Sequence, residues 1–196
     1  MADKPQALIF TGGHHTSGLA VAKKLKDKVT IIWFGHRHSA WGDKSDSAEY
    51  REVTAENLDF IDIQAGKFHH TFHPRKLMRI PWGFFQSLYY LLKISSRFKI
   101  VGIVSFGGYL AVPVVITGKL LGIKSITYEQ TLVAGWANRL ISKFCQIIAL
   151  SWPQSQTFFP PAKSVIVGLP VREEILKSKF YPSPNQIYIT GGKQGS

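Results

Sequence analysis

The chain has 196 residues, of which 45% are hydrophobic, and it carries a formal net charge of +12. This length suits one α/β domain with at most part of a second, and the apolar fraction is sufficient for a packed core. The single cysteine, Cys145, excludes an internal disulfide, and no run reaches the roughly 18 apolar residues of a membrane-spanning helix. The N-terminus lacks the pattern of a secretory signal, so we expect a cytoplasmic protein.

Continuous apolar runs predict seven strands, each followed by a glycine turn, a polar loop or a helical segment. The predicted strands cover residues 7–10, 29–34, 58–63, 100–106, 125–128, 147–150 and 165–167. Helical spacing or length predicts helices at 17–25, 82–94, 112–121 and 135–144, and the polar segment 36–50 is predicted to be a loop. This alternation indicates an α/β fold with a doubly wound, mostly parallel, Rossmann-like sheet, whose ligands bind at the carboxyl ends of the strands.

The end of the chain differs in composition from the rest. Two proline-rich stretches, 158–161 and 181–185, are typical of loop crossings or linkers. A further strand-like run at 186–190 is followed by a glycine turn and no helix. We therefore predict a first domain over 1–163, an interdomain segment over 164–185, and the opening strand and loop of an absent second domain over 186–196. An edge strand that completes the first sheet is the alternative.

Two predicted strands end in paired glycines. Thr11-Gly12-Gly13-His14 follows the first strand, and Phe106-Gly107-Gly108-Tyr109 follows the fourth. Glycine lets the backbone turn tightly and approach a ligand, and the helix that follows presents a positive N-terminus, which together favour a phosphate. Either turn alone could be a simple strand–helix connection, whereas two turns facing one cleft suit a diphosphate. His14, just before a helix N-terminus, should stay neutral and could accept a proton.

A carboxylate, Glu129, directly follows the fifth predicted strand. It could act as a general base or orient a sugar hydroxyl. Alternatively, it could cap the next helix or pair with Arg139. Asn138 lies inside that helix, where a structural role is the default.

Basic residues are concentrated in one part of the sequence. Between Ile63 and Tyr128 there is no acidic residue, while lysines and arginines recur throughout. The asymmetry favours a polyanionic partner, although a solvated basic face with no partner would show the same pattern. Cations alternate there with large apolar side chains, which predicts a patch for an anionic membrane surface at Arg75, Lys76, Leu77, Arg79, Trp82, Phe84 and Phe85. No base-stacking or groove-reading motif supports a nucleic acid. Three nearby histidines lack the carboxylate or cysteine partners that would favour a metal.

Four segments carry a resemblance to a known family: SFGGYLAVP, YEQTLVAGWANRL, VGLPVR and ITGGKQGS. In their order and spacing they resemble the MurG family of bacterial transferases, which move GlcNAc from UDP-GlcNAc to lipid I. The resemblance extends from about residue 8 to 196. It implies the N-terminal, acceptor-binding Rossmann-like domain of a two-domain GT-B glycosyltransferase. The donor domain would then be nearly absent, and we expect a truncated chain that is inactive alone.

The resemblance also implies roles for individual residues. His14 and Glu129 match catalytic candidates. The acceptor diphosphate would be held by Gly107, Gly108, Tyr109 and Asn138. The donor would be held by Thr11, Gly12, Gly13, Thr131, Arg172, Gly192, Lys193 and Gln194. The chain differs from the family pattern at Tyr128, where the motif has histidine, and at Thr131, where it has asparagine.

The expected reaction is inverting transfer of GlcNAc to undecaprenyl-diphosphate-linked MurNAc-pentapeptide, in peptidoglycan synthesis, with His14 or Glu129 as base. No metal or cofactor is expected. The expected partners are a UDP-sugar, a polyprenyl-diphosphate-linked acceptor and an anionic membrane at its cytoplasmic face, with no nucleic acid. Two alternatives remain open: the acceptor half of a split GlcNAc transferase, and a non-catalytic domain that docks on membranes.

Overall fold

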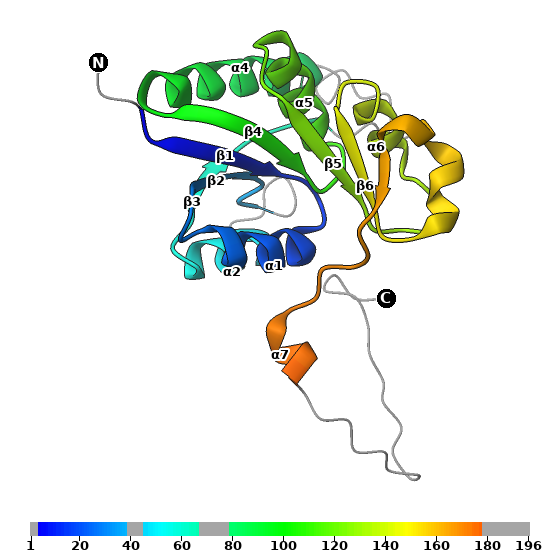
Figure 1. Ribbon diagram of the computed structural model, residues 1–196. Coiled ribbons are helices and arrows are strands. Elements are labelled where there is room, and N and C mark those ends of the chain that lie inside the picture. The colour runs from blue at the N-terminus through cyan, green and yellow to red at the C-terminus, as the bar shows by residue number, and fades with distance from the viewer. Residues whose placement is uncertain (1–3, 39–44, 67–78, 178–196) are drawn as a thin grey trace.

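A computed structural model describes residues 4–38, 45–66 and 79–177. Within these ranges the chain forms a seven-stranded sheet in which all paired strands are parallel, in the order β3-β2-β1-β4-β5-β6-β7 (Figure 1). The strands are β1 (Gln6–Thr11), β2 (Thr30–Gly35), β3 (Asp59–Asp62), β4 (Lys99–Ser105), β5 (Ser125–Glu129), β6 (Ile147–Leu150) and β7 (Ser164–Ile166). The predicted Rossmann-like α/β class is confirmed.

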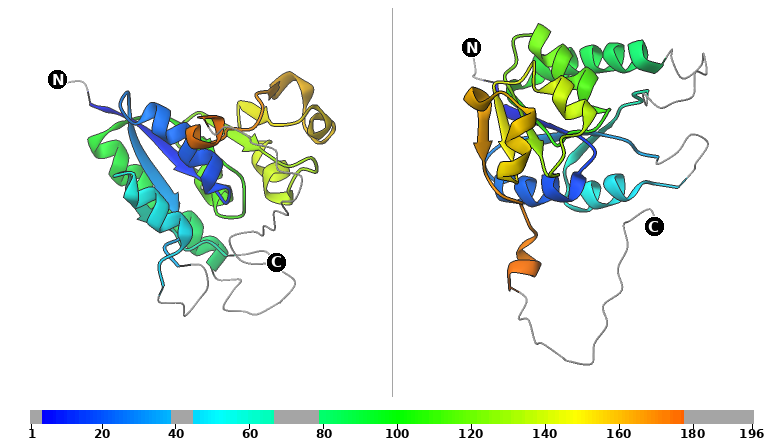
Figure 2. Two further views of the ribbon diagram at one scale, coloured as in Figure 1. Left: turned by 90° about the horizontal axis from the view of Figure 1, so that it is seen from below. Right: turned by 90° about the vertical axis from the view of Figure 1, so that its right-hand side faces the viewer.

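Helices cover both faces of the sheet (Figure 2). On one face, α1 (His15–Leu25) and α2 (Ala48–Ala55) pack with Phe10 and Trp33. On the other, α4 (Arg79–Arg97), α5 (Ala111–Leu120) and α6 (Trp136–Ile141) pack with Ile9 and Ile103. A short helix, α7 (Glu173–Lys177), follows β7. Apolar strands buried on both sides explain why the sequence shows continuous apolar runs rather than alternation. No helix in the described part of the chain is long and apolar enough to cross a bilayer.

The structure corrects two local predictions. Residues 48–50 belong to α2, not to the loop predicted over 36–50, and the Ser47 hydroxyl caps this helix by accepting from the amide of Tyr50. The helix escapes prediction because it buries a single residue, Val53, so its apolar periodicity is weak. In addition, α6 ends at Ile141, three residues before the predicted end, and turns complete the segment.

The position of β7 bears on the predicted boundary between the first domain and the interdomain segment. β7 begins at Ser164, the first residue of the predicted interdomain segment, and pairs with β6 in the same sheet. The sheet therefore continues to Ile166. The predicted strand and glycine loop at 186–196 lie outside the described residues.

The position of β1 determines where a ligand site can form. β1 lies between β2 and β4, so the strand order reverses at this point, and Thr11 pairs with Ser105 at the carboxyl ends of β1 and β4. Ligands of open parallel sheets bind in the crevice at such a switch point. Both glycine turns leave the sheet there.

Candidate functional site

The two glycine turns are joined into one unit by their backbones. The amide of Gly13 donates to the carbonyl of Gly107 at 2.9 Å, and the amide of Phe106 donates to the carbonyl of Thr11 at 2.7 Å. Gly12 has φ +134°, and a Cβ there would lie 2.7 Å from the Gly107 oxygen. The close approach of the two turns thus requires glycine at position 12.

These contacts narrow the set of amides that could bind a phosphate. The amide of Gly13 is engaged by Gly107, and that of Gly107 donates to the Ser105 hydroxyl at 3.2 Å. The amide of Gly108, at φ +79°, makes no hydrogen bond within the described part of the chain. Gly108 lies three residues before Ala111, the first residue of α5, whose amide donates to the Gly108 carbonyl at 3.2 Å, so the Gly108 amide is a well-placed anion donor near the N-terminus of α5.

His14 occupies the N-cap position of α1, beside the first glycine turn. Its side chain is partly buried, and its Nδ1 lies 3.1 Å from Nε2 of Gln130. Burial lowers the pKa of His14 below its ordinary value of 6.5, while the nearby Glu129 carboxylate opposes part of this shift. The imidazole is therefore neutral at pH 7, as the sequence led us to expect, although burial rather than the helix dipole is the cause.

Glu129 ends β5 and is almost completely buried, with 2% of its surface exposed. One carboxylate oxygen accepts from the amide and hydroxyl of Thr131, at 3.0 and 2.5 Å. The other accepts from the amide of Gly135, the N-cap residue of α6, at 3.1 Å, and from Nδ2 of Asn138 at 3.0 Å. Burial alone would raise the pKa of Glu129, but these hydrogen bonds outweigh it and lower the pKa. All four contacts organise the loop that leads into α6.

Asn138 links this carboxylate to the second glycine turn. Its Nδ2 also donates to the carbonyl of Tyr128 at 3.1 Å, and its Oδ1 accepts from the hydroxyl of Thr127 at 2.9 Å. A Cβ on Gly107 would lie 2.7 Å from Asn138, so this side chain supports the turn from beneath. With 3% of its surface exposed and every amide atom engaged, Asn138 is placed as a support. Its predicted contact with an acceptor diphosphate stays a prediction.

We expect Asn138→Ala to lower the free energy of unfolding by about 2–4 kcal/mol, because it leaves buried hydrogen-bonding groups unpaired. Urea denaturation of this chain measures the effect. The neighbouring variant Arg139→Ala is the control, because the contacts of Arg139 with described residues are a hydrogen bond to the Ala134 carbonyl and stacking on Phe158. Its expected loss is under about 1 kcal/mol. Equal losses for the two variants would contradict the supporting role of Asn138.

The other predicted site residues lie at several places around the glycine turns or outside the described residues. The Tyr109 hydroxyl is 2.8 Å from Nε2 of His36, which ties the second turn to the end of β2. Thr11 is fully buried, and its hydroxyl has no partner among the described residues. Arg172 is exposed just before α7. An ion pair between Lys24 of α1 and Glu173 of α7, with 3.4 Å between ammonium nitrogen and carboxylate oxygen, connects these two helices. Gly192, Lys193 and Gln194 lie outside the described residues.

Sequence reasoning missed a bridge formed by Gln130. The hydroxyl of Ser17 donates to Oε1 of Gln130 at 3.0 Å, while Nε2 of Gln130 contacts His14. In the sequence Gln130 stands out only as part of the segment YEQTLVAGWANRL, and Ser17 carries no signal. Tyr128 also has a clear position: it is buried, and its hydroxyl contacts Ser151 and donates to the carbonyl of Gly168. Tyr128 thus connects β5 to the segment that follows β7.

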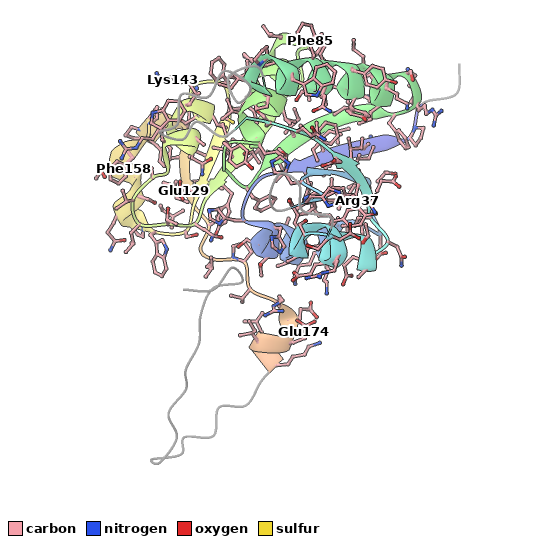
Figure 3. The ribbon with its side chains drawn as sticks, turned by 180° about the vertical axis from the view of Figure 1, so that it is seen from behind. Arg37, Phe85, Glu129, Lys143, Phe158 and Glu174 are labelled. Atoms are coloured by element: carbon pink, nitrogen blue, oxygen red, sulfur yellow. The ribbon has the colours of Figure 1, made fainter. Side chains whose placement is uncertain are left out.

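The predicted membrane patch is described in part. Trp82 and Phe85 are exposed on α4, with Phe85 on its outer side, whereas Phe84 is partly buried (Figure 3). Arg75, Lys76 and Leu77, and the side chain of Arg79, lie outside the described residues. The structure extends the exposed apolar face along α4 through three more side chains: Leu88, Tyr89 and Leu92.

Comparison with known proteins identifies the family. The profile of the glycosyltransferase family 28 N-terminal domain matches residues 8–150. Two curated relatives share the name UDP-N-acetylglucosamine--N-acetylmuramyl-(pentapeptide) pyrophosphoryl-undecaprenol N-acetylglucosamine transferase. The relative from Elusimicrobium minutum is 31% identical over 95% of this chain and 52% of its own length. The relative from Clostridium perfringens is 29% identical over 98% of this chain and 56% of its own length.

Solved structures show the same fold. The Acinetobacter baumannii MurG structure matches 88% of this chain and 48% of its own, with a TM-score of 0.65 and 24% identity. A UDP-N-acetylglucosamine 2-epimerase matches 93% of this chain and 53% of its own, also with a TM-score of 0.65, but at 10% identity. The chain thus spans about half the length of the curated relatives that it matches. Because the family profile covers most of the sequence, the chain belongs to glycosyltransferase family 28, of which it contains the N-terminal domain.

Proposed function

We propose that the full-length protein is an inverting hexosyltransferase that moves GlcNAc from UDP-GlcNAc to undecaprenyl-diphosphate-linked MurNAc-pentapeptide, in peptidoglycan synthesis. The observation that carries this proposal is the pair of joined glycine turns at the switch point of the sheet, with His14 beside them. The family and the names of the relatives supply the reaction class and the two substrates. This chain would contribute the acceptor side of the site.

In this proposal the acceptor diphosphate binds beside the amide of Gly108 and the N-terminus of α5, together with Gly107 and Tyr109. The positive end of α5 would stabilise the diphosphate charge. The acceptor hydroxyl would then reach His14, which takes its proton as the oxygen attacks the anomeric carbon of GlcNAc and the bond to UDP breaks. Glu129 does not act as the base in this scheme, because its two carboxylate oxygens already accept four hydrogen bonds within the protein.

The donor side rests on fewer described contacts. We propose that Gly12, Gly13 and Thr131 face the UDP-sugar from this domain, and that Arg172, Gly192, Lys193 and Gln194 approach it from the segment that follows. Thr131 is exposed while its hydroxyl reaches Glu129, so its backbone position is fixed at the surface of the loop. Thr11 would support this region from beneath, since its side chain is buried.

The variant Gly13→Ala tests acceptor binding in this chain. Gly13 is exposed, and an added Cβ would make only an ordinary contact of 3.8 Å with Gly108, so the fold should survive. We expect binding of a water-soluble, short-chain prenyl-diphospho-MurNAc-pentapeptide, measured by calorimetry, to weaken by about tenfold, or about 1.4 kcal/mol. The extra methyl would stand 3.8 Å from Cα of Gly108, beside the amide proposed to hold the diphosphate, so Gly13→Ala crowds the acceptor seat as well as the donor side.

Gly102→Ala provides the matched control for that titration. Gly102 lies in β4, and a Cβ there would also make only ordinary contacts, the nearest at 3.5 Å. We expect its affinity for the same ligand to equal that of the unsubstituted chain. If Gly13→Ala binds as tightly as Gly102→Ala, the diphosphate is not seated on the glycine turns, and the proposal loses its basis in the structure.

We also propose that the protein lies peripherally on the cytoplasmic face of the membrane, with α4 against an anionic surface. Trp82, Phe85, Tyr89 and Leu92 recur at the spacing of one helical face, and each is at least half exposed. The ammonium group of Lys93 is 5.8 Å from the ring of Tyr89, which places a cation at the edge of this face. Aromatic side chains would enter the headgroup layer while nearby cations attract anionic lipids.

The double variant Phe85→Ser/Tyr89→Ser should reduce flotation with anionic phosphatidylglycerol vesicles by at least about tenfold, because two large apolar side chains no longer insert. Val133→Ser is the matched control, since Val133 and Phe85 are both 66% exposed and Val133 lies on the loop after β5. We expect this control to float like the unsubstituted chain. An equal loss in both variants, or retention on RNA in place of vesicles, would contradict a specific membrane face on α4.

A further inference from the structure

Gln130 forms a bridge between two segments that are distant in the sequence. It accepts a hydrogen bond from the buried Ser17 hydroxyl at 3.0 Å, and its Nε2 lies 3.1 Å from Nδ1 of His14. The indole of Trp152 donates to the backbone carbonyl of Gln130 at 3.0 Å. Both ends of the Gln130 side chain and its backbone are therefore held by partners on α1 and on the segment after β6.

The direction of the amide decides which nitrogen of His14 carries the proton. With Nε2 of Gln130 facing the ring, the amide donates to Nδ1, so a neutral His14 carries its proton on Nε2. In that state the imidazole has no lone pair left for an acceptor hydroxyl. Within the described part of the chain Nε2 of His14 makes no hydrogen bond, so it is the nitrogen that could face a substrate.

Reversal of the same amide produces the opposite tautomer at little cost. The carbonyl oxygen of Gln130 would then accept from Nδ1–H of His14, and the amide NH₂ would donate to Ser17. A hydroxyl can either donate or accept, so Ser17 can hydrogen-bond to the Gln130 amide in both of its orientations. A group that only donates could not do this. Only the reversed direction leaves a lone pair on Nε2 of His14.

We propose that Gln130 is a positioning residue that selects the reactive tautomer of His14 by reversing its amide against Ser17. This inference rests on the proposed function, because it assumes that His14 is the base. After His14 takes a proton, the Gln130 carbonyl still accepts from Nδ1–H and stabilises the imidazolium. A neutral amide performs this task without the attraction of a carboxylate, which would hold a proton on His14 before the substrate arrives.

Nuclear magnetic resonance of this chain tests the tautomer directly. In ¹⁵N-labelled protein held above the pKa of His14, two-bond correlations of the ring report the fraction with the proton on Nδ1. Gln130→Met keeps the size of the side chain but cannot donate to Nδ1 as the amide does in the structure, so we expect this fraction to rise toward that of a free imidazole. Gln130→Glu should drive the fraction toward Nδ1–H and raise the pKa of His14 by a unit or more. The exposed Gln154→Met should change neither value.

Identical His14 ring signals in the unsubstituted chain, Gln130→Met and Gln130→Glu would overturn the proposal. Near-ultraviolet circular dichroism checks that each variant retains its tertiary structure, and Gln130→Glu provides a second reading if Gln130→Met unfolds. In the full-length enzyme, Gln130→Met should lower kcat with KM nearly unchanged, and Gln130→Glu should shift the acidic limb of the pH profile upward. The tautomer is measured without turnover. Absence of GlcNAc transfer would therefore not change the tautomer result, and an unchanged tautomer would not contradict the proposed transferase activity.

Discussion

Replacing His14 with alanine in the full-length protein is expected to lower kcat for GlcNAc transfer by about 10²–10⁴-fold, with KM for UDP-GlcNAc nearly unchanged. His14 stands at the N-terminus of α1 beside the glycine turns, and burial keeps it neutral. The competing base, Glu129, accepts four hydrogen bonds and has a lowered pKa, so it has neither a free lone pair nor much affinity for a proton. Steady-state turnover of radiolabelled UDP-GlcNAc with a lipid-linked acceptor measures the effect.

The adjacent histidine supplies the matched control. His15 faces Glu52, with 3.4 Å between Nε2 and the carboxylate, so its ring is directed at α2. We expect His15→Ala to retain kcat within about threefold. Full turnover in His14→Ala, combined with loss in a normally folded Glu129→Gln protein, would assign the base to Glu129 and contradict the mechanism.

The pKa of His14 also predicts the pH dependence. A base must be deprotonated to act, so kcat/KM should rise with pH as the enzyme passes through the pKa of His14. Because that pKa lies below 6.5, the acidic limb should be complete below neutrality and should disappear in His14→Ala. A limb above pH 7 would point to another group.

The fold could be predicted from the sequence because its strands are buried on both faces. Such strands appear as short continuous apolar runs, and the glycine pairs after residues 11 and 106 mark where two of them end. The strand order could not be predicted in this way, because it depends on which strands pair. The helix at Ala48–Ala55 was missed because it buries only Val53 and relies on the Ser47 cap.

The site could be predicted as a set of residues but not as a set of contacts. The paired glycines indicated a phosphate seat, yet only the structure shows that the Gly13 and Gly107 amides are used within the protein. Likewise, Glu129 offered four roles in the sequence, and its burial against Thr131, Gly135 and Asn138 favours helix capping. The contact between Ser17 and Gln130 joins positions 113 apart, a separation that no local pattern encodes.

Gly12→Ala is expected to destabilise this chain by about 3 kcal/mol or more, a large part of the roughly 5–15 kcal/mol that stabilises a typical domain. At φ +134° an alanine is strained, and its Cβ would lie 2.7 Å from the Gly107 oxygen and 2.8 Å from the Phe106 nitrogen. These are backbone atoms, so no side-chain rotation relieves the overlap. The second turn would have to move away, which breaks the hydrogen bond between Gly13 and Gly107.

Urea denaturation of Gly12→Ala and Gly122→Ala separates the cost of backbone strain from the cost of steric overlap. Gly122 also has a positive φ, +75°, but nothing lies within 4 Å of a Cβ at this position. Its expected cost is therefore only the left-handed strain, about 1–2 kcal/mol. The difference between the two variants measures how tightly the glycine turns are joined. Equal midpoints would mean that the turns can separate freely, and the diphosphate seat proposed at Gly107 and Gly108 would then lack a fixed shape.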